Sequence, residues 1–292
     1  MPLAHVLLAL VVTLIWGFNF IVVKVGVGTV PPLLLCGLRF LFAALPTVFF
    51  LPRPQTDWRI VGSYGFVLGV VKFGLLFTAI AIGMPAGLAS LVLQAQAFFT
   101  ILFAAVLLRE KPGPHQILGG LVACLGLILI AWPRLTGSDV LPFLLTVAAA
   151  AAWGVANIIS KRAGRIDMLA FVVWASLIPP IPLFALSFWL EGWERIAPAL
   201  THMDVTAIGA VAYLAYPTTI VGFGIWGFLL SRHSAATVAP FSLLVPITGI
   251  ACASLILGER MLPVEILGGA VIVSGLAINT FGGRALQRLK PA

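Results

Sequence analysis

The sequence contains few charged residues for its length. Only 9% of its 292 residues are Asp, Glu, Lys or Arg, whereas 61% are apolar. An ordinary soluble domain has about 25% charged residues. The shortage excludes an ordinary soluble domain and indicates an integral membrane protein. The first apolar stretch follows no basic segment and shows no cleavage site, so we expect it to remain as a span rather than be removed as a signal peptide.

Cysteine is scarce, and the common catalytic motifs are missing. The three cysteines, Cys36, Cys124 and Cys252, lie inside apolar runs with no histidine close in sequence, which argues against a disulfide framework and a metal site. The sequence has no Walker A loop, dinucleotide-binding G-x-G-x-x-G unit, HExxH or G-x-S-x-G motif. We therefore expect no cofactor, no metal and no enzymatic activity, and ATP-driven transport would require a separate subunit.

Acidic residues are missing from the centres of the apolar segments. All nine Asp and Glu residues lie in loops or near segment ends. Proton-coupled transporters often carry the proton on a buried carboxylate. The sequence therefore leaves open whether transport is proton-coupled or facilitated.

The chain has instead a series of long apolar segments. A membrane-spanning helix needs about 20 mainly apolar residues. Ten segments qualify, and they are 4–23, 31–50, 60–82, 86–108, 115–133, 140–160, 168–190, 204–230, 234–257 and 262–281. They predict an all-α integral membrane protein with ten transmembrane helices.

Basic residues are distributed unequally over the loops. If the N-terminus is inside, eleven Lys and Arg residues fall in inside loops and four in outside loops. This bias predicts that both termini are cytoplasmic. The net charge of +8 indicates no nucleic-acid partner, because the basic residues flank apolar segments and form no single patch.

Two blocks of sequence occur twice. WGFNFIVVK (16–24) resembles WGVANIISK (153–161), and LREKPGPHQILGGLVACLG (108–126) resembles LGERMLPVEILGGAVIVSG (257–275). The order of the blocks predicts two five-helix repeats, residues 1–137 and 138–292, that form one transport unit. Because five is odd, the second repeat is inverted in the membrane, and inverted repeats are typical of transporters with a substrate site near the midplane.

Two basic residues lie within the predicted spans. Lys72 is near the middle of the third span, whereas Arg39 in the second lies nearer an end. A lysine at a helix centre costs about 2.5–3.5 kcal/mol on insertion scales, so its side chain should face the protein interior or a wet cavity. The sequence leaves open whether Lys72 binds a substrate carboxylate or has a structural role.

The repeated Trp-Gly blocks each carry a possible pair of binding residues. Trp16 and Asn19 lie three residues apart, and Trp153 and Asn157 lie four apart, so each pair can share a helix face. Both pairs are candidates to flank a shared cavity. The alternative is tryptophan packing together with hydrogen bonds from asparagine to neighbouring helices.

The other candidates for substrate binding are spread over several spans. Gln94 and Gln96 are two residues apart, or roughly 200° around a helix, so one should line a cavity and the other should bind another helix. The remaining candidates are four aromatic residues and a serine: Phe73, Phe77, Tyr216, Trp226 and Ser242. Residues of these types more often pack than bind.

Helix breakers and small residues suggest which spans bend and which pack. Pro217 interrupts the eighth span, and Pro240 and Pro246 interrupt the ninth, so we expect these spans to form cavity walls or hinges. The fifth and tenth spans contain glycines seven residues apart, which allow close helix packing, at positions Gly119, Gly126, Gly268 and Gly275. The packing could occur within a monomer or across a homodimer.

Two glutamates precede the paired ILGG stretches. Glu110 follows the fourth span and Glu259 follows the ninth. We expect both to be structural ends of these spans.

Several stretches resemble a known transporter superfamily. WGFNF (16–20), WGVAN (153–157) and the two ILGG blocks, each with a glutamate seven positions before its isoleucine, resemble the drug/metabolite transporter superfamily, EamA type. KVGVGTVPPLLLCGLRF (24–40), GMPAGLASLVLQAQAFFTI (83–101) and IVGFGIWG (220–227) resemble the bacterial O-acetylserine/cysteine exporters. In the superfamily, spans 1–4 and 6–9 surround a central cavity, and spans 5 and 10 pack at the periphery.

The resemblance implies a multi-pass protein of the bacterial inner membrane. It would export small amino acids or related metabolites of the cysteine/O-acetylserine type by alternating access, with a small-molecule substrate and membrane lipid as its partners. We expect a neutral residue in place of Lys72 in many relatives, so this lysine would alter the substrate range. Two alternatives are a broad-specificity exporter of amino acids, aromatic ones included, or drugs, and a lipid flippase or scramblase.

Overall fold

A computed structural model describes residues 1–134, 140–164 and 166–288, and over these residues the regular structure is helical. Ten helical segments are long and apolar enough to cross a membrane. The first five are α1 (Leu3–Gly26); α2 (Pro32–Ala44) with η1 (Thr47–Phe49); α3 (Trp58–Tyr64), η2 (Gly65–Lys72) and α4 (Phe73–Ala81); α5 (Ala86–Val92), η3 (Leu93–Ala95) and α6 (Gln96–Leu107); and α7 (Pro114–Ala131) with η4 (Trp132–Arg134).

The second five spans follow the same plan. They are α8 (Val140–Arg162); α9 (Met168–Ala175) with α10 (Pro180–Leu190); α12 (Val205–Ala215), η5 (Tyr216–Val221) and α13 (Gly222–Arg232); η6 (Ala239–Leu243) and α15 (Leu244–Leu257), preceded by α14 (Ala235–Val238); and α16 (Pro263–Arg288). The ten-span prediction is confirmed. The predicted boundary between the repeats, at residues 137 and 138, lies outside the described residues.

Irregular turns occur at matching places in the two groups of five. Spans 3 and 8 each contain a π-helical segment, η2 and η5, and spans 4 and 9 each contain a 3-10 segment, η3 and η6. Pro217 is the second residue of η5 and has no backbone N–H to donate. Segments of this kind often mark functional sites or hinges.

The Trp-Gly repeat has a packing explanation. At Gly17 of α1, an added Cβ would lie 2.9 Å from the Gly249 nitrogen of α15. At Gly154 of α8, an added Cβ would lie 3.0 Å from the Thr100 nitrogen of α6. Each glycine therefore lets its span approach a span of the other group of five. These paired contacts are consistent with inverted repeats.

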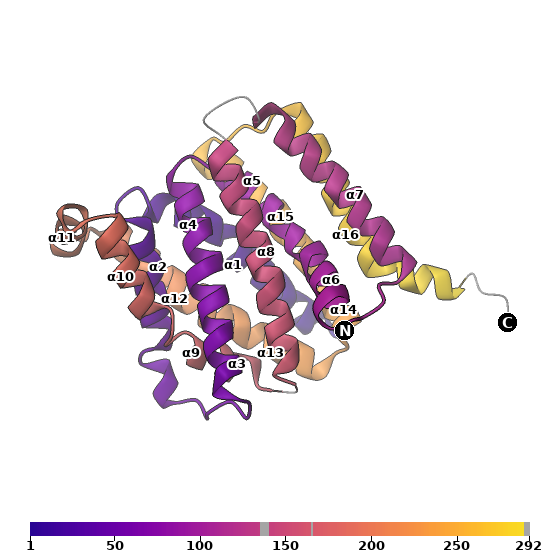
Figure 1. Ribbon diagram of the computed structural model, residues 1–292, viewed down its shortest axis with the longest axis horizontal. Coiled ribbons are helices and arrows are strands. Elements are labelled where there is room, and N and C mark those ends of the chain that lie inside the picture. Colours follow the sequence, from indigo (N-terminus) through magenta and orange to yellow (C-terminus); the bar gives the residue numbers. More distant parts are fainter. Residues whose placement is uncertain (135–139, 165, 289–292) are drawn as a thin grey trace.

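The fifth and tenth spans pack against each other within the chain. Helices α7 and α16 lie side by side at one edge of the molecule (Figure 1). A Cβ at Gly126 would lie 2.6 Å from the Gly268 carbonyl oxygen, and one at Gly119 would lie 2.6 Å from the Gly275 oxygen. The expectation of packing is confirmed, and the glycines are already used within one chain.

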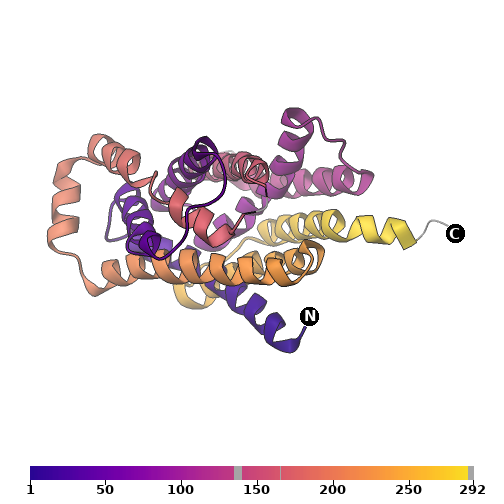
Figure 2. The same ribbon diagram turned by 90° about the horizontal axis from the view of Figure 1, so that it is seen from below.

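One helix was not expected from the sequence. The short helix α11 (Trp193–Thr201) lies at one edge of the molecule, apart from the bundle of spans (Figures 1 and 2). It buries Ile196 and exposes Trp193. Such an amphipathic segment fits a position at the membrane interface.

Candidate functional site

Two buried cations lie against one aromatic ring. Lys72 ends η2 in span 3, and Arg39 lies in α2 of span 2. The Lys72 Nζ is 3.2 Å and the Arg39 Cζ is 4.0 Å from the centroid of the Phe73 ring. The side chains are 3% and 2% exposed. We call Lys72, Arg39, Phe73, Trp153 and Thr219 the cation cluster.

The aromatic rings around Lys72 partly replace its lost water. Its Nζ also lies 4.5 Å from the ring centroid of Trp153, which α8 contributes. The π segment that ends at Lys72 packs against α8. A cation over an aromatic face gains about 0.5–2 kcal/mol. Lys72 is therefore less costly to bury here than it would be among purely aliphatic side chains.

Only part of the Arg39 guanidinium is hydrogen-bonded. Its Nη2 donates to Thr219 Oγ1 at 3.4 Å, whereas its Nε and Nη1 have no hydrogen-bond partner among the described residues. Its guanidinium is also 5.4 Å from the Phe40 ring centroid. A buried donor without a partner costs about 1–3 kcal/mol, so an acceptor that reached these two nitrogens would remove that cost.

The cation cluster contains no acidic residue. No ion pair joins Lys72 or Arg39 to a carboxylate in the part of the chain that the structure describes. Buried charges are normally paired. Carboxylates and phosphates are the groups that bind such cations most strongly.

A second cluster, made of Trp16, Phe223 and Trp226, joins span 1 to span 8. The Trp16 Nε1 donates to the Thr218 carbonyl oxygen at 3.1 Å, and the Trp16 ring lies 5.3 Å from that of Trp226 and 5.4 Å from that of Phe223. Asn19, one turn further along α1, is 5% exposed, and its Oδ1 has no partner in the described structure. Thr218 and Thr219 are adjacent in η5, so this segment touches both clusters.

The candidates in spans 4 and 6 bind each other. Asn157 Nδ2 donates to Gln96 Oε1 at 2.7 Å and to Thr100 Oγ1 at 3.0 Å. Gln96 is therefore the glutamine that binds another helix, and Gln94 is 9% exposed in η3. A pocket of about 210 Å³ borders Asn157 and extends to Glu110 and Lys161.

Three further candidates lie outside the cation cluster. Phe77 is fully buried, with its ring 6.1 Å from that of Phe73. Tyr216 is 39% exposed at the start of η5. Ser242 donates to the Ala239 carbonyl oxygen within η6. The structure does not bring these three together.

Thr218 and Thr219 were missed by the analysis of the sequence. The sequence offered one signal for them. Two hydroxyl residues follow a proline within an apolar span, in the part of span 8 that corresponds to the Lys72 region of span 3. Phe223 had no signal beyond its apolar span.

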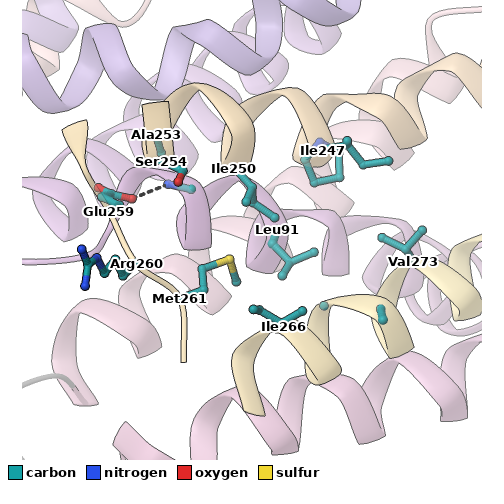
Figure 3. Close-up of a pocket in the computed structure, with 14 residues that line it drawn as sticks. Leu91, Ile247, Ile250, Ala253, Ser254, Glu259, Arg260, Met261, Ile266 and Val273 are labelled. Atoms are coloured by element: carbon teal, nitrogen blue, oxygen red, sulfur yellow. Dashed lines mark hydrogen bonds between the residues drawn. The ribbon is translucent and has the colours of Figure 1, made fainter. Parts of the chain in front are cut away.

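A larger pocket lies between α5, α15 and α16 (Figure 3). Its volume is about 710 Å³, and its lining is mainly apolar, with Leu91, Ile250 and Ile266 among the residues drawn. Glu259 and Arg260 lie at one end. None of the residues that line this pocket belongs to the cation cluster.

Known proteins resemble this chain over almost its whole length. The model of the EamA-like transporter family matches residues 3–132 and 141–281. A "probable amino-acid metabolite efflux pump" of Escherichia coli (strain K12) is 44% identical and covers 97% of each chain. A "probable terminal-alkyne amino-acid exporter" of Streptantibioticus cattleyicolor is 27% identical, also over 97% of each.

A solved structure supports the fold. It is titled "Crystal structure of protein", has a TM-score of 0.63 and 20% identity, and covers 97% of this chain and 99% of its own. Ten apolar helices, paired contacts between two groups of five spans and a family match across both groups lead to one conclusion. The chain belongs to the EamA-like transporter family.

Proposed function

We propose that this protein is a secondary transporter that exports small amino acids of the cysteine/O-acetylserine type across the bacterial inner membrane by alternating access. The observation that carries the proposal is the cation cluster. Lys72 and Arg39 are buried against one ring without a carboxylate partner among the described residues. An amino-acid carboxylate has the charge and the acceptor atoms that both side chains require.

The other half of a zwitterion needs acceptors. Asn19 Oδ1 is buried and has no partner in the described structure, so it is suited to accept from the substrate ammonium. We assign Asn157 and Gln94 to the remaining polar contacts, because Gln96 Oε1 already accepts from Asn157. Aromatic rings would shape the side-chain pocket, and they are Trp16, Trp153 and Trp226 together with Phe73.

The orientation follows from the distribution of basic residues. With both termini in the cytoplasm, the inside loops hold most of the Lys and Arg residues.

A broad exporter of amino acids or drugs is the nearest alternative, because the aromatic rings beside the clusters suit larger substrates. A lipid flippase is the alternative from another class.

Counterflow in proteoliposomes tests the proposal without an imposed gradient. Vesicles are loaded with one unlabelled compound, either cysteine, O-acetylserine, glutamine, threonine, phenylalanine or cysteamine, and entry of labelled cysteine is followed. Cysteamine is cysteine without its carboxylate. Lys72→Gln and Arg39→Gln are compared with the exposed-site control Arg59→Gln.

We expect exchange for the small amino acids and little for cysteamine. Losing one bond to a charged group costs about 1.5–3 kcal/mol, so Lys72→Gln should slow cysteine exchange at least about tenfold and remove the preference over cysteamine. Exchange by every compound, unchanged in Lys72→Gln, would favour the broad exporter and a structural lysine. If no amino acid exchanges while the protein moves a fluorescent phospholipid, the flippase replaces this proposal.

A further inference from the structure

Two glutamates that match in the sequence repeat have different partners in the structure. Glu110 and Glu259 occupy the same position in the blocks 108–126 and 257–275. Lys24 and Lys161 match in the same way at the ends of the two Trp-Gly blocks. Glu259 with Lys24 and Glu110 with Lys161 are therefore equivalent in sequence. The two combinations lie at opposite ends of the bundle.

Glu259 binds the beginning of another span. Its Oε1 accepts from the Ala86 nitrogen at 2.8 Å, and its Oε2 accepts from the Gly87 nitrogen at 2.9 Å. These nitrogens open α5, whose N-cap residue Pro85 makes no side-chain cap. A carboxylate here satisfies two free backbone donors and interacts favourably with the helix dipole.

Lys24 binds the span that ends just before α5. Its Nζ donates to the Ile80 carbonyl oxygen at 3.2 Å, near the C-terminus of α4. Lys24 and Glu259 thus hold the two sides of the short connection between spans 3 and 4. In that connection Met84 is 0% exposed.

At the other end, the counterparts bind each other. Lys161 Nζ and Glu110 Oε1 form an ion pair in which the side chains are 56% and 46% exposed. An exposed ion pair contributes little to stability. The helix end that corresponds to α5 is α14, which begins at Ala235.

Burial of spans 4 and 9 follows the same asymmetry. Every residue of α5 is buried, and α5 packs against α15 so closely that a Cβ at Gly87 would lie 3.2 Å from that of Ala253. In contrast, α6 and η6 contain no buried residue in the described structure. The start of span 4, which Glu259 binds, is therefore buried, whereas the described residues of α6 and η6, toward the Glu110 end, are not.

We propose that Glu110 and Glu259 are a pair of alternating gate residues. In the conformation described here, Glu259 closes its end by binding α5, while Glu110 is held away by Lys161. In the opposite conformation, Glu110 leaves Lys161 and binds the first nitrogens of α14, and Glu259 leaves α5 and pairs with Lys24. This inference rests on the proposed function, because alternating access is what requires the second conformation.

The exchange predicts opposite effects for the same substitution at the two sites. Glu259→Gln keeps one acceptor but loses the charge and one bond to α5, so it weakens the conformation described here more than the opposite one. Glu110→Gln loses an exposed ion pair here and the buried cap in the opposite conformation. The first variant should open the Glu259 end, and the second should keep it closed.

Cysteine labelling in detergent, without substrate, measures the two conformations. Met84→Cys reports on the Glu259 end, and Ser234→Cys, at an exposed position, reports on the Glu110 end. Maleimide labelling of each cysteine is quantified by mass spectrometry. Cys36, which is buried, is the internal control for unfolding. The matched control is Glu191→Gln, because Glu191 also binds two helix-start nitrogens, those of Leu33 and Leu34.

We expect Glu259→Gln to raise the Met84→Cys labelling rate about tenfold and to lower that of Ser234→Cys. Glu110→Gln should lower Met84→Cys labelling, and Glu191→Gln should change neither rate. Changes in the same direction for both gate variants, an equal rise with Glu191→Gln, or a parallel rise at Cys36 would overturn the proposal. Because no substrate is used, reciprocal labelling together with failed counterflow would reject the amino-acid substrate but retain the gate.

Discussion

The contact between Lys72 of span 3 and Trp153 of span 6 should contribute measurably to the free energy of unfolding. The Nζ lies 4.5 Å from the Trp153 ring centroid, in a buried site. A double-mutant cycle with Lys72→Met and Trp153→Leu should give a coupling energy of about 0.5–2 kcal/mol. The measurement is thermal unfolding in detergent. Additive effects of the two substitutions would mean that the ring does not stabilise the ammonium.

Two histidines are in contact, one in α1 and one directly after α13. His5 Nδ1 and His233 Nε2 are 2.7 Å apart. His233 follows α13, and its pKa is lowered from the usual 6.5 by partial desolvation first, and then by His5, the N-terminal amine and Arg232. Between the lowered pKa and 6.5, the unfolded chain binds a proton at this residue that the folded chain does not.

The free energy of unfolding should therefore fall as the pH drops below 6.5. In His233→Gln, the melting temperature should change less between neutral pH and about pH 5.5 than in the unsubstituted protein. His202→Gln is the control, because His202 contacts its neighbour Thr201 in an exposed position. An equal reduction in both variants would show that the contact between His5 and His233 is not the cause.

At the scale of elements, the α7–α16 contact depends on the absence of side chains. A Cβ at Gly126 would lie 2.6 Å from the Gly268 oxygen, whereas the nearest atom to a Cβ at Gly120 is 3.6 Å away on Phe98. Gly126→Ala should destabilise the protein by about 1–3 kcal/mol. Gly120→Ala should be neutral or slightly stabilising, because alanine favours helix more than glycine does.

Thermal unfolding of the two alanine variants compares a close helix contact with an open position in the same helix. If Gly126→Ala is as stable as Gly120→Ala, the two helices can separate at no cost. That result would contradict the close packing of α7 on α16.

At the scale of the whole molecule, the unequal loop charges predict a single orientation. Green fluorescent protein fused after residue 292 should fluoresce, and alkaline phosphatase fused there should be inactive, because the C-terminus is expected in the cytoplasm. A phosphatase fusion in the connection between spans 9 and 10 should be active. The reverse pattern would invert the topology and, with it, the side to which the exposed Glu110 end faces.

Much of the architecture could be predicted from the sequence. The ten spans follow from apolar length, which is a local property of each segment. The packing of the fifth and tenth spans followed from glycines at Gly119, Gly126, Gly268 and Gly275, because small residues on one face permit close approach whatever the partner. Matching sequence blocks predicted two repeats, and the paired turns and contacts of the structure are consistent with them.

The composition of the candidate site depended on tertiary structure. The sequence predicted that the Lys72 side chain would face the protein interior or a wet cavity. It did not predict that Arg39 would share the Phe73 ring or that Thr219 would accept from Arg39. It also left open which glutamine binds another helix, and hydrogen bonding to Asn157 identifies Gln96. These outcomes depend on how distant helices rotate against one another, and no local pattern determines that rotation.

Glu110 and Glu259 show most clearly which features follow from sequence and which from tertiary packing. The equivalence of Glu110 and Glu259 can be read from the sequence, since each follows its span and precedes an ILGG stretch. Tertiary structure alone decided that Glu259 binds the start of α5 while Glu110 binds Lys161. The same repeated residues can bind either of two sets of partners, and the packing of spans 4 and 9 selects one set at each end.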